Sequence, residues 1–296
     1  MQRRVEITRF EGINHQLAVI PAAGKERKDI ALVAITRIPG TALARCVLTH
    51  IERQAIDVGQ ALAQHRAYQN ALRKTGMRVI ELPEDPSLPD GVFVEDTAVV
   101  LDELAVIAAP APASRRGEWI AVEGALRPFR PVVRIPENTF LEGGDVVRMG
   151  RTLYVGQGGR TSEAGLQALQ GLVVPLGYSV VPVRLRGCLH LKSACTVLDE
   201  ETLLVNRARL DTSALAGRRL VDAPPEEPWG PNVLSLPGMT IVSATCPQTV
   251  KLLRGLGQPA VALDVSELHK AEGGLTCMSL VFDDRNEDRT RVAHPC

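Results

Sequence analysis

Four stretches of the chain pair two short apolar runs around a turn sequence. The runs are rich in Val, Leu and Ile, and polar residues or glycine separate the two runs of each pair. This pattern is typical of a β-hairpin. The four predicted hairpins are TAVVLDELAVIAAP from 97, DVVRMGRTLYVG from 145, CTVLDEETLLVN from 195 and NVLSLPGMTIVS from 232.

Segments with helical periodicity lie between the hairpins. Two of them are RGEWIAVEGALRPF from 116 and TSEAGLQALQGLV from 161. In the second, Thr161 or Ser162 is suited to cap the helix, and the apolar residues that follow recur on one face. The chain is therefore predicted to alternate helices with hairpins.

Polar residues that a structural strand does not need stand just before the hairpins and before the apolar run MSLVF. They are Glu95 with Asp96, Glu142, His190, Asn232 and Cys277, and counted from Glu95 their spacings are 47, 48, 42 and 45 residues. A period in the 40s is typical of repeated supersecondary units around an axis or along a solenoid, and five units fit this length. Equivalent positions would then converge on one site. The alternative is that loops before hairpins are often polar and that the spacings arise by chance.

Composition narrows the classes of function. The 296 residues include 34 Lys and Arg against 34 Asp and Glu, and only 3% are aromatic. A chain without excess positive charge or stacking residues is unlike a nucleic-acid-binding protein. We find no secretory signal and no membrane span in the sequence, so we expect a cytoplasmic protein with a small-molecule ligand. Six cysteines without a C-x-x-C pair predict reduced thiols.

Cys277 and His190 are the candidates for nucleophilic chemistry. Cys277 follows two glycines and begins an apolar strand, while His190 stands between two leucines. A lone cysteine there is more often a small buried hydrophobe, and a lone histidine is more often structural. Together they match the thiol and imidazole pair of cysteine nucleophiles, whose partners meet in space rather than in sequence.

Carboxylates accompany this pair in VFVEDTAVV and FLEGGDVV. A carboxylate that begins an apolar strand is costly to bury unless it meets a cation or hydrogen-bond donors. Glu95 and Asp96 therefore indicate a cationic ligand, with helix capping or salt bridging as the alternative. The residues LEGGD lack the spacing of a metal site, and GQGGR from 156 lacks the ending of a phosphate loop, so we predict neither.

Several long motifs identify a family. They are ELPEDPSLPDGVFVEDTAVV, APASRRGE, LEGGDVV, VGQGGRTSEAG, LHLKSACTVL and GGLTCMSL. From about Ala31 to Phe282 the chain resembles dimethylarginine dimethylaminohydrolase, within the pentein or amidinotransferase superfamily. The resemblance implies an α/β fold, a five-bladed β/α propeller of ββαβ-type units, and no cofactor. It implies a single catalytic domain over residues 31–296, preceded by an N-terminal extension of unknown role at residues 1–30.

The resemblance also implies an activity, the hydrolysis of methylated arginines to citrulline and methylamine or dimethylamine. Cys277 would attack the guanidinium carbon, and His190 would protonate the departing amine and then activate water. The remaining residues that the resemblance implies are Glu95, Asp96 and Glu142 around the guanidinium, with Glu142 counted among the catalytic groups, Arg115 and Arg160 at the substrate carboxylate, Asp90 at a further polar contact, and the backbone of Leu48 and Ala271.

Two alternatives stay open at this point. An arginine deiminase or another guanidino-modifying enzyme would need the same thiol, imidazole and carboxylates. A non-catalytic pentein would use the fold as a binding scaffold and would have no need for these residues together. We expect a guanidino amino acid as substrate and neither nucleic acid nor membrane as a partner, and we leave a homodimer open.

Overall fold

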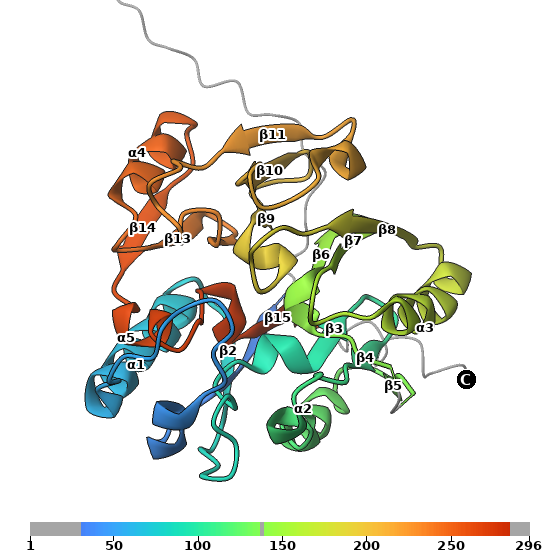
Figure 1. The fold of residues 1–296 in the computed structure, drawn as a ribbon, viewed down its shortest axis with the longest axis horizontal. Helices are drawn as coiled ribbons and strands as arrows, with labels where there is room; N and C mark the ends of the chain where they lie inside the picture. The colour runs from blue at the N-terminus through green and yellow to red at the C-terminus, as the bar shows by residue number, and fades with distance from the viewer. Residues whose placement is uncertain (1–30, 137–138, 285–296) are drawn as a thin grey trace, which may run out of the picture. The chain divides into compact units, whose positions relative to one another are not determined.

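The computed structural model describes residues 31–136 and 139–284 (Figure 1). Within them, strands form five three-stranded sheets. Each sheet has the same plan, because its first strand runs antiparallel to its second and its second runs parallel to its third. The extension expected at residues 1–30 lies outside the described residues.

Four of the sheets are continuous in the chain and begin with a hairpin. All four predicted hairpins are confirmed by the antiparallel pairing of their strands. In chain order these sheets consist of β3 (Ala98–Val100), β4 (Ala105–Ile107) and β5 (Val132–Arg134); β6 (Val146–Met149), β7 (Thr152–Gln157) and β8 (Ser179–Arg184); β9 (Cys195–Val197), β10 (Thr202–Val205) and β11 (Arg219–Asp222); and β12 (Leu234–Leu236), β13 (Met239–Ser243) and β14 (Ala260–Leu263).

The fifth sheet joins two distant parts of the chain. Strand β1 (Leu32–Arg37) pairs in parallel with β2 (Arg78–Leu82) and antiparallel with β15 (Leu280–Asp283). Leu32 lies opposite Asp283 in this register. The last strand of the described chain therefore completes the sheet that the first strand begins.

Helices connect the second and third strands of four sheets. They are α1 (Val58–Lys74), α2 (Trp119–Leu126), α3 (Glu163–Val173) and α4 (Pro247–Gly255), and a short helix α5 (Ser266–His269) follows β14. The predicted cap of α3 is confirmed as Ser162, whose hydroxyl accepts the Gly165 amide at 3.0 Å. The β10–β11 connection contains only a 3₁₀ turn, at Thr212–Leu215. None of the described helices is long and apolar enough to cross a membrane.

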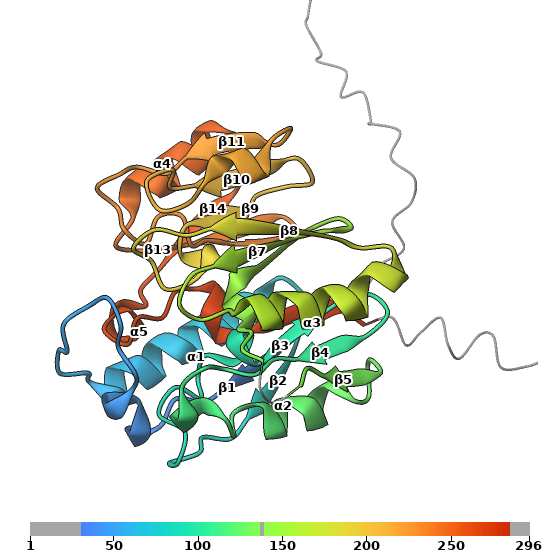
Figure 2. The same ribbon diagram turned by 45° about the vertical axis from the view of Figure 1, so that its right-hand side comes forward.

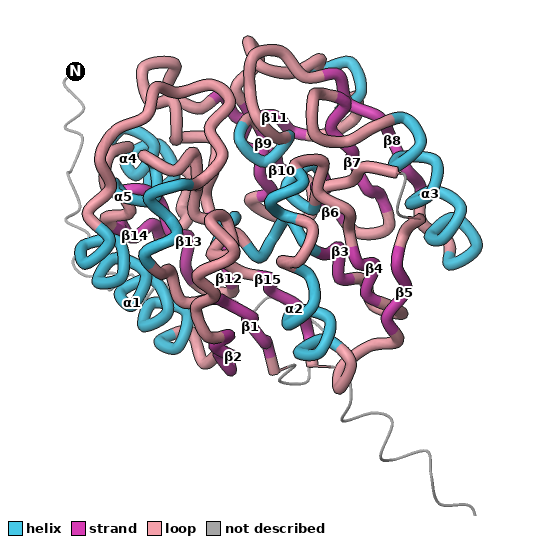
Figure 3. The backbone as a smooth tube through the Cα atoms, turned by 60° about the horizontal axis from the view of Figure 1, so that its bottom comes forward, coloured by secondary structure: helices cyan, strands magenta, loops and turns pink. Residues whose placement is uncertain are grey.

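The core consists of five apolar clusters, and each cluster is shared by two sheets. Successive sheets along the chain share a cluster, and the sheet of β12–β14 shares one with the sheet of β1, which includes Ala34 and Ile241. Figure 1 shows β3, β6, β9 and β15 toward the middle of the view, with α1, α2, α3 and α4 outside them, and Figure 3 shows α1, α3 and α4 at the sides. In Figure 2, α3 lies beside β7 and β8. The first strands of the sheets thus surround a common region.

His65 on α1 is the least well satisfied polar residue of this core. It is fully buried, and neither of its ring nitrogens has a hydrogen-bond partner. Burial lowers the pKa of His65 to about 4. The imidazole therefore stays neutral in the folded protein at pH values where an unfolded chain would bind a proton.

We expect His65→Leu to stabilise the protein and to remove part of its acid sensitivity. Since the folded pKa lies below the unfolded value near 6.5, stability falls as pH drops from 6.5 to 4, by about 3 kcal/mol from this group. Urea unfolding at pH 7 and pH 4.5 measures the effect. The matched change at exposed His50, His50→Leu, should leave the pH dependence as it is, and an equal pH slope in wild type and His65→Leu would contradict the prediction.

Candidate active site

Four short 3₁₀ turns contain or directly follow most of the residues that the sequence singled out. They are Val94–Thr97, Gly143–Asp145, Leu191–Ser193 and Thr276–Met278, and they directly precede β3, β6, β9 and β15. The turns contact one another. The repeat in the sequence thus corresponds to a repeated position in the fold, which brings distant residues together.

In two of these turns neighbouring residues face opposite sides, Glu95 and Asp96 in one and Thr276 and Cys277 in the other. Asp96, His190 and Cys277 line a small pocket of about 20 Å³. Glu95, Lys192 and Thr276 line a separate cavity of about 470 Å³. A 3₁₀ turn advances about 120° per residue, so consecutive side chains cannot share one side. The thiol and the imidazole belong to the smaller pocket.

The imidazole of His190 is held by carboxylates. Its Nε2 lies 2.6 Å from Glu142 Oε2 and 3.7 Å from Asp96 Oδ1, and all three residues are buried. Burial alone would lower the pKa of His190, but Asp96 and the hydrogen bond with Glu142 offset this and raise it above the usual value. The same contact lowers the pKa of Glu142 against the effect of burial. An imidazolium paired with a carboxylate is therefore the favoured state.

The Cys277 thiol lies in the same pocket. Its Sγ accepts a hydrogen bond from the Gly274 amide at 3.4 Å. Burial raises the pKa of this thiol, and the charges of Glu95 and Asp96 raise it further. The resting thiol is therefore protonated, and a cation entering the pocket would favour its ionisation. The other four described cysteines are also free thiols, as predicted, and Cys296 lies outside the described residues.

Two buried arginines border the pocket and differ in how fully they are occupied. Arg115 makes a bidentate contact with Glu118 at 2.9–3.1 Å, and its Nη1 lies 2.9 Å from Asp96 Oδ2 and 3.5 Å from Glu142. Arg160 contacts Glu142 at 3.3 Å and donates to Thr49 Oγ1 at 2.8 Å. Every nitrogen of Arg115 thus already faces a carboxylate, so Arg160 is the better placed of the two to receive a further anion.

Acidic side chains hold one wall of the pocket through backbone amides. Asp90 accepts from the Val47 amide at 3.1 and 3.2 Å. Glu272 accepts from the amides of Thr49 and His50 at 2.5 and 2.7 Å. The segment from 47 to 50 therefore lies across the pocket and is held there by side chains from distant loops.

Asp96, Glu142 and His190 are also the described residues whose arrangement could hold a metal ion, because their ligand atoms lie within 4.8 Å of one another. Arg115 and Arg160 contact the same carboxylates. Fixed positive charges at this distance oppose the binding of a divalent cation. The arrangement suits an organic cation that adds one charge better than a metal.

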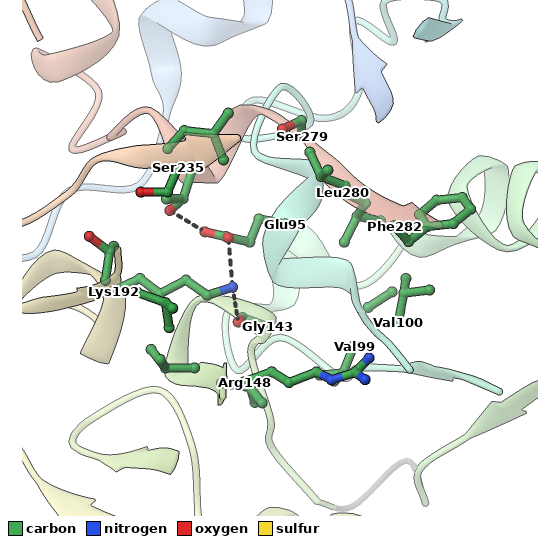
Figure 4. Close-up of a pocket in the computed structure, with 18 of the residues that line it drawn as sticks. Glu95, Val99, Val100, Gly143, Arg148, Lys192, Ser235, Ser279, Leu280 and Phe282 are labelled. Carbon is green, nitrogen blue, oxygen red and sulfur yellow. Dashed lines mark hydrogen bonds and ion pairs between the residues drawn. The ribbon is translucent and has the colours of Figure 1, made fainter. Parts of the chain in front are cut away.

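Figure 4 shows the larger cavity and the ion pair that crosses it. Lys192 Nζ lies 2.7 Å from Glu95 Oε1 and donates to the Gly143 carbonyl at 3.2 Å. The other oxygen of Glu95 accepts from Thr276 Oγ1 at 2.7 Å. These contacts occupy both oxygens of the Glu95 carboxylate in the larger cavity, and a direct contact of Glu95 with a guanidinium stays a prediction.

The structure brings most of the expected residues to one place. Asp90, Asp96, Arg115, Arg160, His190, Ala271 and Cys277 line the smaller pocket, and Glu142 contacts three of them. The Leu48 side chain packs against the apolar core while its neighbour Val47 lines the pocket, so the expected backbone contact of Leu48 stays a prediction. Glu95 lines the larger cavity.

The sequence did not predict the residues that orient the pocket residues through hydrogen bonds without lining the pocket themselves. Glu118 orients Arg115, and Asp145 accepts from the Leu191 amide at 3.0 Å and from Thr161 Oγ1 at 2.7 Å, which fixes the turn after His190. Both stand inside motifs quoted above, in RRGE and LEGGD. Their position next to a candidate residue was the available signal, but an acidic residue in a loop is usually solvated.

The sequence matches one family model, described as "N,N dimethylarginine dimethylhydrolase, eukaryotic", over residues 46–213. The curated N(G),N(G)-dimethylarginine dimethylaminohydrolase of Streptomyces coelicolor is 40% identical over 249 residues, which cover 83% of this chain and 95% of that protein. The protein of the same name from Pseudomonas aeruginosa is 33% identical over 228 residues, covering 76% and 90%.

Solved structures are similar over the same part of the chain. The Pseudomonas aeruginosa enzyme, as a cysteine-to-serine mutant complexed with citrulline, has a TM-score of 0.81 and 31% identity, covering 86% of this chain and 99% of that one. A dimethylarginine dimethylaminohydrolase adduct with S-methyl-L-thiocitrulline also has a TM-score of 0.81, with 30% identity and coverage of 86% and 100%. The N-terminal domain of ArgZ, a cyanobacterial arginine dihydrolase, has a TM-score of 0.76 at 18% identity, covers 84% and 97%, and shares the fold.

Gly144 provides a test of how closely the turns pack. A Cβ at this position would lie 2.5 Å from Asp96 Oδ1 and 2.8 Å from His190 Nδ1. We expect Gly144→Ala to destabilise the protein by about 1–3 kcal/mol, as overpacking typically does, measured by urea unfolding. Gly124→Ala is the matched control, because its Cβ meets open space on α2. An equally stable Gly144→Ala protein would contradict this description of the turns.

Proposed function

The chain belongs to the dimethylarginine dimethylaminohydrolase family, and we propose that it hydrolyses dimethylarginine and monomethylarginine at the pocket of Cys277 and His190. The observation that carries the proposal is the convergence of a thiol and a carboxylate-bound imidazole on one buried pocket. The reaction is the hydrolysis of a guanidino C–N bond, which gives citrulline and dimethylamine from dimethylarginine.

The substrate cation supplies what the resting pocket lacks. Burial and the nearby carboxylates hold the pKa of the thiol high, and a guanidinium placed between Asp96 and Cys277 would offset the charge of the carboxylates. The thiol can then lose its proton to solvent and attack the guanidinium carbon, and the released amine later takes up a proton from solvent to become dimethylammonium. The proposed nucleophile is thus mostly protonated in the resting enzyme and ionises readily when substrate binds, so it reacts slowly with other electrophiles.

His190 then serves as acid and as base. As imidazolium it donates a proton to the dimethylamine nitrogen while the C–N bond breaks, which leaves a thiouronium on Cys277. The neutral imidazole next takes a proton from water, whose oxygen attacks the same carbon, and the C–S bond breaks. In sum, one guanidinium and one water give citrulline and dimethylammonium, and Glu142 stabilises the imidazolium at both ends of the cycle.

The charges of the pocket residues indicate which of them bind the α-carboxylate and α-ammonium end of the substrate. Arg160 is proposed to bind the α-carboxylate, with Arg115 behind it as a fixed charge, and Asp90 and the Ala271 backbone border the same end. A pocket of about 20 Å³ holds little more than one water. Substrate entry therefore requires the segment from 47 to 50 to move outward, with loss of the amide bonds to Glu272.

The remaining assignments concern the chain as a whole. We propose that the five sheets, which share their apolar clusters in sequence, are the blades of a five-bladed β/α propeller, and that residues 31–296 act as one catalytic domain. A cytoplasmic location, a homodimer, and the lack of nucleic-acid and membrane partners stay predictions.

We expect Cys277→Ser to lose nearly all turnover of dimethylarginine while remaining folded, because the hydroxyl is a far weaker nucleophile. Purified protein is incubated with dimethylarginine, monomethylarginine, arginine and agmatine, and citrulline and the released amine are measured. Cys246→Ser is the matched control, since its side chain lies beside the Thr245 hydroxyl and away from the pocket. Arginine as the best substrate, with ammonia released, would make the enzyme a deiminase and overturn the substrate assignment.

Arg160→Ala should raise KM for every amino-acid substrate by about 10- to 100-fold, because a hydrogen bond to a charged group is worth about 1.5–3 kcal/mol. The same change should reduce the difference in KM between dimethylarginine and a guanidino compound that has no carboxylate. Steady-state kinetics measure both effects, and Arg186→Ala, at an exposed position, is the control. An unchanged KM would show that Arg160 does not read the carboxylate.

A further inference from the structure

Asn232 is the repeated polar residue to which the proposed chemistry gives no role. It stands just before β12, separated from the strand by Val233, at the position equivalent to Glu142, His190 and Cys277 in the other units, and it is 3% exposed. It lines neither the substrate pocket nor the larger cavity. A buried amide needs hydrogen-bond partners, and the identity of those partners indicates what Asn232 does.

The Asn232 amide joins the turn of the imidazole to the turn of the thiol. Its Nδ2 donates to the Lys192 carbonyl at 2.9 Å and to Thr276 Oγ1 at 3.0 Å, and its Oδ1 accepts from the Thr276 amide at 3.2 Å. Lys192 is two residues from His190, and Thr276 directly precedes Cys277. One side chain therefore sets the distance between the two catalytic segments.

The same two partners connect Asn232 to the carboxylate-bearing turns. Lys192 Nζ and Thr276 Oγ1 both bond the carboxylate of Glu95, each at 2.7 Å, and Lys192 also reaches the Gly143 carbonyl. Glu95 precedes Asp96, and Gly143 follows Glu142. The network thus reaches all four turns from the side opposite the substrate, as Figure 4 shows for its Glu95 and Lys192 part.

Gly274 brings this network next to the sulfur. A Cβ at Gly274 would lie 2.4 Å from Asn232 Oδ1, so only glycine lets the backbone pack against the amide. The Gly274 amide is also the donor to Cys277 Sγ. The position of Asn232 therefore determines where the hydrogen-bond donor of the thiol lies.

We infer that Asn232 is a positioning residue for catalysis, which holds the Cys277 and His190 turns in register without touching the substrate. This inference rests on the proposed function of those two residues. It assigns a distinct effect to the loss of the amide: substrate should still bind, but the thiol and the imidazole should be misplaced relative to each other.

The test compares Asn232→Ala with the wild-type enzyme. A misplacement of about 1 Å costs about 100-fold in rate, so kcat for dimethylarginine should fall by about 10- to 100-fold while KM changes by less than about threefold. Rates are normalised to the fraction of native molecules, measured by urea unfolding, so that partial unfolding is not counted. Asn206→Ala, which removes an amide from a surface turn, should show wild-type kinetics.

Thr276 provides the rescue. Thr276→Val removes the hydroxyl that bonds Asn232 and Glu95 and should lower kcat as Asn232→Ala does, whereas Thr276→Ser keeps the hydroxyl and should restore most of the rate. A second readout needs no substrate. The rate of Cys277 alkylation by iodoacetamide at fixed pH should fall several-fold in Asn232→Ala, because the Gly274 donor is no longer held in place.

The outcomes separate this inference from the proposed function. Wild-type protein that turns over no methylarginine would refute the proposed function, and the alkylation rate would then decide the role of Asn232. An active wild type with normal kcat in Asn232→Ala would refute the inference alone. A loss of activity matched by an equal loss of native molecules would show that Asn232 supports folding only, which also overturns it.

Discussion

Burial of carboxylates beside a thiol is the constraint on which the rest of the site depends. Asp96 and Glu142 lie in the interior, where an isolated negative charge is very costly. Arg115, Arg160 and the imidazolium of His190 compensate for them, and each comes from a different segment of the chain. The fold must therefore bring these segments together before the carboxylates can be buried. The same charges leave the thiol protonated until a further cation arrives.

The 3₁₀ turns allow this constraint to be met in a small space. Because adjacent residues of a turn face opposite sides, Asp96 serves the substrate pocket while Glu95 bonds Lys192 and Thr276 behind it. The chemistry and its support are thus built from consecutive residues. A displacement of Glu95 or Thr276 is transmitted to Asp96 or Cys277 through a single peptide unit. The ionic and amide contacts of Glu95 and Thr276 therefore hold the reacting residues in place.

The sequence predicted the hairpins and the convergence of the polar residues well, because both depend on local alternation and on spacing. The pairing of Ala98 with Ile107 and the cap at Ser162 follow from neighbouring residues. The direction of the Glu95 side chain could not be predicted from neighbouring residues, because a shift of one residue in a 3₁₀ turn moves a side chain to another side. Glu118 was missed although its partner Arg115 stands in the same motif, because an acidic residue in a loop is usually solvated. The pairing of β1 with β15 is likewise long-range, and no local sequence pattern predicts it.

The sheet of β15, β1 and β2 has a consequence for synthesis on the ribosome. Strand β1 emerges early, but its antiparallel neighbour at Leu280–Asp283 is translated after all the other described strands. One side of β1 must stay unpaired until then, or be shielded by a chaperone. Cys277 is translated only a few residues before β15. A nascent chain therefore acquires its nucleophile at nearly the same moment as it becomes able to close its first sheet, so an incompletely translated protein would lack both.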